Sequence, residues 1–204
     1  MATYVNNLRL KEIGTGDESG TWGASTNTNL ELLGEALGFG TEAITTNADT
    51  HTTTVADGSS DAGRALYIIY TGTLDSACTI TIGPNTMKRV HVIKNGTSGS
   101  QNILISQGSG ANITIAAGET KVVSLDGAGS GAAVTEVFSA LSLVSPSLTG
   151  TPLSTTADAG TNTTQVATTA FVKTAVDNAA PFPSGTSMLF QQTAAPTGWT
   201  KQTT

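Results

Sequence analysis

The pattern of hydrophobic and polar positions marks seven short β-prone runs between residues 64 and 140, several of which alternate with period two. In chain order these are ALYIIYT, ACTITI, RVHVIK, NILIS, ANITI, TKVVSL and AVTEVF. Alternation with period two, carried by Ile, Val and Thr, indicates β-strands that rest one face on a core. Turn-forming stretches such as Gly83-Pro84-Asn85 and Asn95-Gly96 separate the runs. The pattern therefore predicts a small antiparallel domain over 64–140, of the β-sandwich or jelly-roll kind.

Residues 1–40 combine a short alternating run at Leu8 and Leu10 with one amphipathic helix. We expect the helix within Asn27–Leu37, because Thr28 and Glu31 fit a capping box and Gly38 suits the C-terminal end. Three leucines form its apolar face and a tryptophan lies just ahead of it: Leu30, Leu33, Leu37 and Trp22. These residues either bind another protein or cover the adjoining β-domain, and the sequence leaves both readings open.

Residues 41–63 are polar and rich in threonine, and they show no usable period. We interpret them as a linker or an extended arm. Residues 141–180 then divide into two unlike parts. Ser145–Thr164 holds Pro146 and Pro152 and has little apolar surface, whereas Gln165–Asn178 has the pattern of a short amphipathic helix.

A helix as short as Gln165–Asn178 is marginal in water unless its apolar face packs on something. The simplest partner is the same helix in another copy of the chain. The residues expected at that contact are Val166, Ala170, Phe171, Val172, Ala175 and Val176. A surface helix that follows a linker in an ordinary monomer is the alternative.

Composition narrows the class of protein. Charged residues make up 12% of the chain and aromatic residues 5%, and the net charge is −6 without a basic cluster. This balance argues against nucleic-acid binding. No apolar run reaches membrane-spanning length, and the N-terminus lacks a signal segment, so we expect assembly in a cytoplasm without export or membrane insertion. Cys78 is the single cysteine, which excludes an intrachain disulfide and favours a buried strand position.

No set of side chains forms a convincing catalytic or metal-binding pattern. Asp49 and His51 supply two ligands at most, and His91 is expected on the outward face of its strand. The neighbouring acids Asp17 and Glu18 lie in a glycine-rich loop, which favours a solvated turn over a pair of catalytic carboxylates. We therefore expect no enzymatic activity, no cofactor and no metal.

Two segments resemble bacteriophage tail fibre proteins. GTPLSTTADAGTNTTQVATTAFVKTAV resembles the tail-fibre repeat, and the N-terminal segment resembles a motif found at the start of phage tail proteins. The repeat match rests on Gly150, Pro152, Asn162, Gln165, Val166, Ala167, Thr168, Thr169, Ala170, Phe171 and Val172; the N-terminal match rests on Leu8, Arg9, Leu10, Trp22, Gly23, Asn27, Asn29 and Leu30. The resemblance implies an elongated, mainly β homotrimer with two short helices, whose N-terminal part faces the virion and whose repeat is a spacer in the shaft.

Residues 181–204 resemble the opening of a tail-fibre collar or tip domain, and we expect that domain to continue beyond Thr204. The match rests on Pro183, Gly185, Thr186, Phe190, Pro196, Gly198 and Trp199.

The resemblance implies a structural virion protein, a tail fibre that attaches through residues 1–40 to a tail, baseplate or adaptor protein. Its distal tip would bind a receptor on the host surface. The alternative is the non-catalytic N-terminal stem of a polysaccharide-degrading tailspike. A cellular adhesin is a more distant reading, because no export signal is visible.

Overall fold

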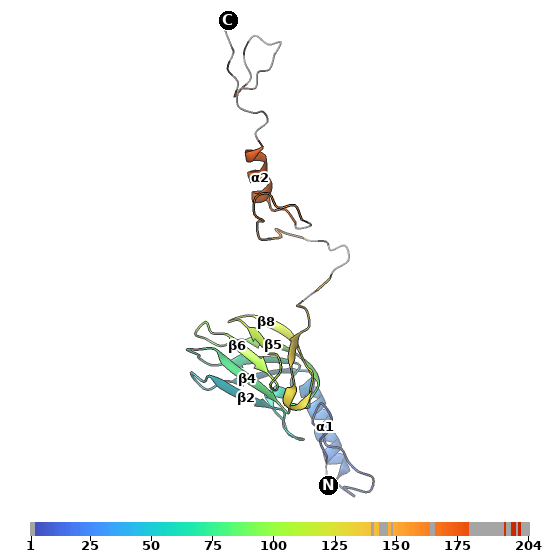
Figure 1. Ribbon diagram of the computed structural model, residues 1–204. Helices are drawn as coiled ribbons and strands as arrows, with labels where there is room; N and C mark the ends of the chain where they lie inside the picture. The colour runs from blue at the N-terminus through green and yellow to red at the C-terminus, as the bar shows by residue number, and fades with distance from the viewer. Residues whose placement is uncertain are drawn as a thin grey trace. The chain divides into compact units, whose positions relative to one another are not determined.

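Strands dominate the computed structural model of this chain, and two α-helices accompany them among the residues it describes, so the expected mainly β class is confirmed (Figure 1). The structure describes residues 3–139, 141–142, 147, 149–163, 166–179, 194, 197–198 and 200. Contacts divide the chain into a first unit, Met1–Ser142, and a second unit, Leu143–Thr204. No helix among the described residues is long and apolar enough to cross a membrane.

The first unit holds one α-helix, nine strands and two 3-10 turns within its described residues. In chain order they are α1 (Trp22–Ala36), β1 (Phe39–Ala43), β2 (Thr50–Thr54), η1 (Ala62–Arg64), β3 (Tyr67–Thr71), β4 (Cys78–Gly83), β5 (Arg89–Asn95), β6 (Ile103–Ser106), β7 (Ile113–Ile115), β8 (Thr120–Leu125), η2 (Gly129–Gly131) and β9 (Val134–Glu136). Every one of the seven β-prone runs expected from the sequence contains a strand.

The first six strands alternate between two sheets. One sheet has the order β1-β3-β5-β8-β9 and the other has the order β2-β4-β6-β7. Neighbours among β1, β3 and β5 are parallel, and so are neighbours among β2, β4 and β6. The chain thus winds through three turns of a two-sided parallel coil, and the antiparallel strands β7, β8 and β9 follow.

Two sequence-based expectations are wrong here. The domain is not purely antiparallel, because a period of two reports which face a residue occupies and not the direction of the neighbouring strand. Residues 41–63 are not a linker, because they contain all of β2 and most of β1 and η1. Strands β1 and β2 escaped notice because polar side chains fill their inward positions: Glu42, His51 and Thr53.

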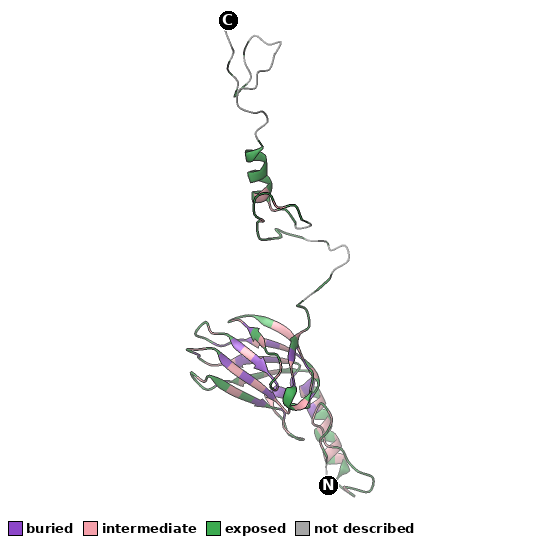
Figure 2. Cartoon of the chain, viewed as in Figure 1, coloured by how far each residue is buried: buried purple, intermediate pink, exposed green. Residues whose placement is uncertain are grey.

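The core lies between the two sheets and is built largely from stacked isoleucines (Figure 2). Ile68 pairs with Ile93 across β3 and β5, and Ile80 pairs with Ile105 across β4 and β6. Cys78 is fully buried beside Ile103, as its strand position predicted. Identical branched side chains in register fill the space evenly from one turn to the next, which suits the parallel coil.

Buried Asn95 closes the corner after β5. Its side-chain nitrogen donates to the carbonyls of Gln101 and Ile115 at 3.0 and 3.1 Å. Its side-chain oxygen accepts from the backbone nitrogen and the hydroxyl of Thr97 at 3.2 and 2.7 Å. Close stacking of the corners also requires Gly99, which has a φ of +97° and no room for a Cβ against the Leu74 carbonyl.

Helix α1 begins several residues earlier than expected, at Trp22 after the N-cap residue Thr21, so Thr28 and Glu31 lie inside it and form no capping box. Tertiary contacts account for the extra turns despite the poor helix propensity of this polar stretch. The Asn29 side chain accepts from the Lys11 backbone nitrogen at 3.0 Å and donates to the Lys11 carbonyl at 2.9 Å. The Lys11 ammonium also donates to the Ser25 hydroxyl at 3.0 Å.

The second unit holds helix α2 (Thr169–Asn178). Its N-cap is Thr168, whose hydroxyl accepts the Phe171 backbone N–H at 3.1 Å. The expected helix start at Gln165 lies outside the described residues. So do most residues that carry the collar-like resemblance: Pro183, Gly185, Thr186, Phe190, Pro196 and Trp199.

Candidate attachment and assembly surfaces

The apolar stripe expected on α1 is largely exposed. Trp22, Leu30 and Leu37 are 62%, 61% and 78% exposed, and Leu33 is partly buried. The helix packs on the first unit through a neighbouring face instead, where Leu32 and Ala36 are buried. The sequence left two roles open for this stripe, binding another protein or covering the adjoining β-domain. Trp22, Leu30 and Leu37 do not cover the β-domain, because they are exposed.

A buried arginine holds α1 and the N-terminal segment to the coil. The guanidinium of Arg64 is fully buried and donates to the backbone carbonyls of Leu8, Ala56 and Ser59, the last at 2.9 Å. It pairs with Asp61 at 3.1 Å and lies 3.9 Å from a carboxylate oxygen of Glu35 on α1. One cation thus joins the N-terminal segment, the loop before η1 and helix α1. The local sequence around Arg64 does not predict this role.

Two further polar side chains of β5 lie against the same junction. Arg89 donates to the Ala36 carbonyl at the end of α1 at 3.4 Å, and burial lowers its pKa. His91 is fully buried and its Nδ1 lies 2.9 Å from the Ala65 carbonyl, so this nitrogen carries the proton. Burial, and then the charge of Arg89, lower the pKa of His91 to about 4. The expected outward position of His91 is wrong: Val90 and Val92 point outward.

Polar pairs also fill the first turn of the coil, between β1 and β2. His51 Nε2 and Glu42 Oε1 lie 2.7 Å apart and bridge the two sheets. The Thr53 hydroxyl and the Tyr70 phenol lie 2.8 Å apart, and burial raises the pKa of Tyr70. Asp49 accepts instead from the Ser76 hydroxyl at 2.5 Å. The carboxylates and imidazole here bond to structural partners.

The other weighed chemical candidates give a similar result. Within the described part of the chain, no group of three or more His, Cys, Asp or Glu side chains is placed to hold a metal ion. Glu18 forms an ion pair with Lys11, and the hydrogen bonds from Lys11 and Ser25 lower the pKa of Glu18. This carboxylate therefore supports the fold of the N-terminal segment.

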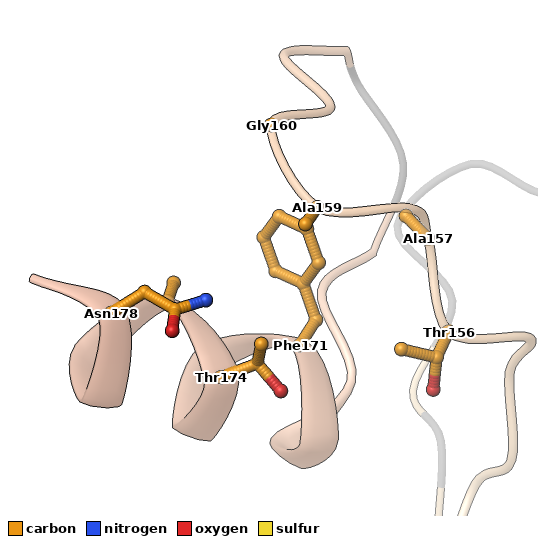
Figure 3. A pocket seen from close by; sticks show the side chains of 8 residues that line it. Thr156, Ala157, Ala159, Gly160, Phe171, Thr174 and Asn178 are labelled. Carbon is orange, nitrogen blue, oxygen red and sulfur yellow. The ribbon is translucent and has the colours of Figure 1, made fainter.

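On α2, the expected assembly face divides into two parts. Phe171 is partly buried, and its ring lies over the loop of its own chain at Ala159 and Gly160 (Figure 3). The ring lines a hollow of about 180 Å³ between that loop and the helix. Val172 and Val176 are 51% and 66% exposed on a different side of the helix.

The remaining residues expected at the assembly contact are also exposed: Val166 at 76%, Ala170 and Ala175. A hydrogen bond of 2.9 Å between the hydroxyls of Thr156 and Thr168 ties the loop to the start of α2. The loop before α2 thus gives Phe171 a packing partner within its own chain, which the polar sequence of that loop did not suggest.

Comparison with known proteins gives no identification: no protein-family model, no curated protein and no solved structure matches this chain.

Proposed function

We propose that this chain is a structural virion protein, a tail-fibre subunit that attaches to a phage tail through α1. The observation that carries the proposal is the apolar stripe of Trp22, Leu30 and Leu37, which the fold leaves exposed on a firmly held helix. The downstream segment resembles the tail-fibre repeat, and this resemblance is the reason why we assign the stripe to attachment on a phage tail. A tail, baseplate or adaptor protein is the proposed partner.

Rigidity is what makes α1 suited to this task. Its 15 residues span about 22 Å, so Trp22 and Leu37 at opposite ends reach a partner groove together. The Arg64–Glu35 ion pair and the bond from Arg89 to the Ala36 carbonyl hold the helix on the coil, and Asn29 ties it to the N-terminal segment at Lys11. Prior fixation lowers the ordering cost of binding, and a large aromatic such as Trp22 commonly dominates an interface.

Beyond the coil, we propose that α2 joins copies of the chain in a homotrimeric shaft. Val172 and Val176 are one helical turn apart and exposed, so together they offer an apolar contact to another copy of this 10-residue helix. The distal part would present a receptor-binding tip to the host. Binding and positioning suffice for this function, and we propose no catalytic role.

A second proposal is that the chain is the stem of a polysaccharide-degrading tailspike. The three parallel turns of the coil favour it, because they resemble the start of a β-helix. In that case the same attachment helix would serve an enzyme encoded after residue 204. The acids of the coil do not favour activity in this part, because Glu42 is held by His51 and Asp49 by Ser76. Sequencing the whole gene separates the two proposals: clustered acids on a long downstream β-helix favour the tailspike.

Immunogold labelling of purified particles from the phage that encodes the chain tests the virion assignment. Antibodies against residues 3–139 should decorate the tail, and unlabelled particles would contradict the proposal.

Attachment through the stripe is tested by Leu30→Lys, with Thr28→Lys as the matched control, because Thr28 is exposed on α1 away from the stripe. Leu30→Lys should abolish incorporation and Thr28→Lys should not. Equal incorporation of both variants would show that the stripe is not the attachment site.

A further inference from the structure

An apolar row crosses the outer face of the five-stranded sheet. Phe39 of β1 pairs with Tyr67 of β3, Tyr67 pairs with Val92 of β5, and Val92 pairs with Val122 of β8. The rings of Phe39 and Tyr67 are 5.5 Å apart, centre to centre. Ile69 lies next to this row, two residues along β3, on the same face. Four neighbouring strands thus present one continuous line of large side chains outward.

This row is not part of the core. Phe39 is 60% exposed and Val90, which faces the same way, is 46% exposed. Tyr67, Val92 and Val122 are partly buried by their neighbours in the sheet, while the residues that alternate with them point into the core. Among the outward side chains of β1, β3 and β5, Lys94 alone is charged.

The outer face of the four-stranded sheet differs sharply in chemistry. Thr52 pairs with Thr81, and Thr50 pairs with Thr79, so hydroxyl-bearing side chains line β2 and β4. Threonine and valine have similar shape and similar preference for strands. Either residue on an outward face should therefore stabilise the strands of the coil to a similar extent. Stability of the strands therefore does not explain why one outer face is apolar and the other is hydroxylated.

We propose that the outer face of the five-stranded sheet is an interface between copies of this chain. The inference rests on the proposed function in one respect, that a fibre shaft brings several copies together along its length. It goes further in naming the surface of the coil through which those copies contact one another. Identical chains of net charge −6 repel one another, so copies can meet only through a surface without acids. The outward side of β1, β3 and β5 carries no acid and therefore lets a second copy approach.

The size of the face suits this role. Five strands spaced about 4.8 Å apart, each about five residues long, give a face of roughly 24 by 17 Å. That face, about 400 Å², is about half of the ~800 Å² per partner of a standard interface. A contact of this size is weak by itself and suits a shaft in which a second contact elsewhere in the chain also holds the copies together.

Cysteine cross-linking of the full 204-residue chain tests the face directly. Val92→Cys places a thiol at the centre of the row, and Thr81→Cys places one at the matching position on the central strand β4 of the other sheet. Cys78 is fully buried, so the wild-type chain reports the background. A short bismaleimide should couple two copies of the Val92→Cys chain and leave the Thr81→Cys chain at the wild-type level.

Sedimentation velocity supplies the second measurement. Val92→Lys should weaken association about ten-fold or more, and Thr81→Lys should leave it unchanged, with circular dichroism confirming that both variants fold. Two results would overturn the inference: a wild-type chain that stays monomeric at high micromolar concentration, or an assembled chain in which Val92→Cys fails to cross-link. In the second case the shaft contact at α2 stands. Gold labelling of virions decides the proposed function independently of either result.

Discussion

The guanidinium of Arg64 donates a hydrogen bond to the backbone carbonyl of Leu8, 56 residues earlier in the chain. The same side chain is fully buried and also reaches the Ala56 and Ser59 carbonyls, Asp61 and Glu35. Segments that are distant in sequence therefore meet on one cation. Arg64 therefore helps to hold the N-terminal segment and α1 on the coil.

Replacing Arg64 should be severely destabilising. Arg64→Met leaves the Asp61 and Glu35 carboxylates and several buried carbonyls without their partner, which costs about 3–5 kcal/mol in comparable buried sites. Urea unfolding monitored by circular dichroism measures the loss. Arg9→Met is the matched control, because the Arg9–Asp57 pair at 2.6 Å is more exposed and its removal should cost about 1 kcal/mol or less. Equal losses for the two variants would contradict the central role of Arg64.

Burial of His91 predicts that acid destabilises the first unit. The pKa of His91 is about 4 in the folded chain, against an ordinary value of 6.5. Between these values the unfolded chain binds a proton that the folded chain does not. The contribution of His91 is therefore complete above pH 6.5 and is lost as the pH falls to 4, by about 3 kcal/mol in total.

The comparison that isolates this effect is wild type against His91→Leu, across pH 4 to 7.5, by urea unfolding. The variant loses the bond to the Ala65 carbonyl at every pH, but it has no imidazole to protonate. The stability difference between the two proteins should therefore shrink as the pH falls. A difference that stays constant with pH would mean that His91 does not titrate between those limits.

Asn95 predicts a second large loss, in the corner after β5. Asn95→Ala leaves the buried Ile115 carbonyl without its donor and frees the Thr97 turn, at an expected cost of about 3 kcal/mol. Asn112→Ala, at an exposed loop position, should change the free energy of unfolding by about 0.5 kcal/mol or less. Thermal unfolding of the two variants measures the contrast, and similar melting temperatures would contradict it.

Strand positions were predictable from the sequence where β-prone apolar residues gather between turns, and all seven such runs hold a strand. Their pairing was not predictable, because the side-chain period is the same in parallel and antiparallel sheets. Strands β1 and β2 were missed since Glu42, His51 and Thr53 occupy inward positions. These polar residues are tolerated there because each has a partner: Glu42 and His51 bond to each other, and Thr53 bonds to Tyr70.

The candidate surfaces divide in the same way. The stripe on α1 was visible in the sequence, but its exposure depends on where Leu32 and Ala36 pack, which local periodicity does not reveal. The valines on both sides of His91 predict an outward histidine, but the strand has the opposite phase and buries it. The outward row through Phe39 and Val92 was hidden because it forms only when distant strands align in register.

The division of α2 gives the last prediction, which concerns the proposed shaft contact. Val172 and Val176 are exposed on one side of the helix, while Phe171 packs on the loop at Ala159. Val176→Asp should therefore dissociate copies of the chain and leave α2 folded, because a carboxylate cannot be buried in an apolar contact without a partner. Phe171→Ala should instead release the helix from its own loop and lower the helical signal before association is affected.

Ala170→Asp supplies the matched control on α2. Ala170 is exposed near the helix N-terminus and turned well away from the two valines, and an acid there is favourable for the helix. Sedimentation velocity should show dissociation for Val176→Asp and little change for Ala170→Asp. If Ala170→Asp dissociates the copies as strongly, the contact does not follow Val172 and Val176. If Phe171→Ala dissociates them with the helical signal intact, the ring contributes to the contact between chains and its place over Ala159 is not what fixes α2.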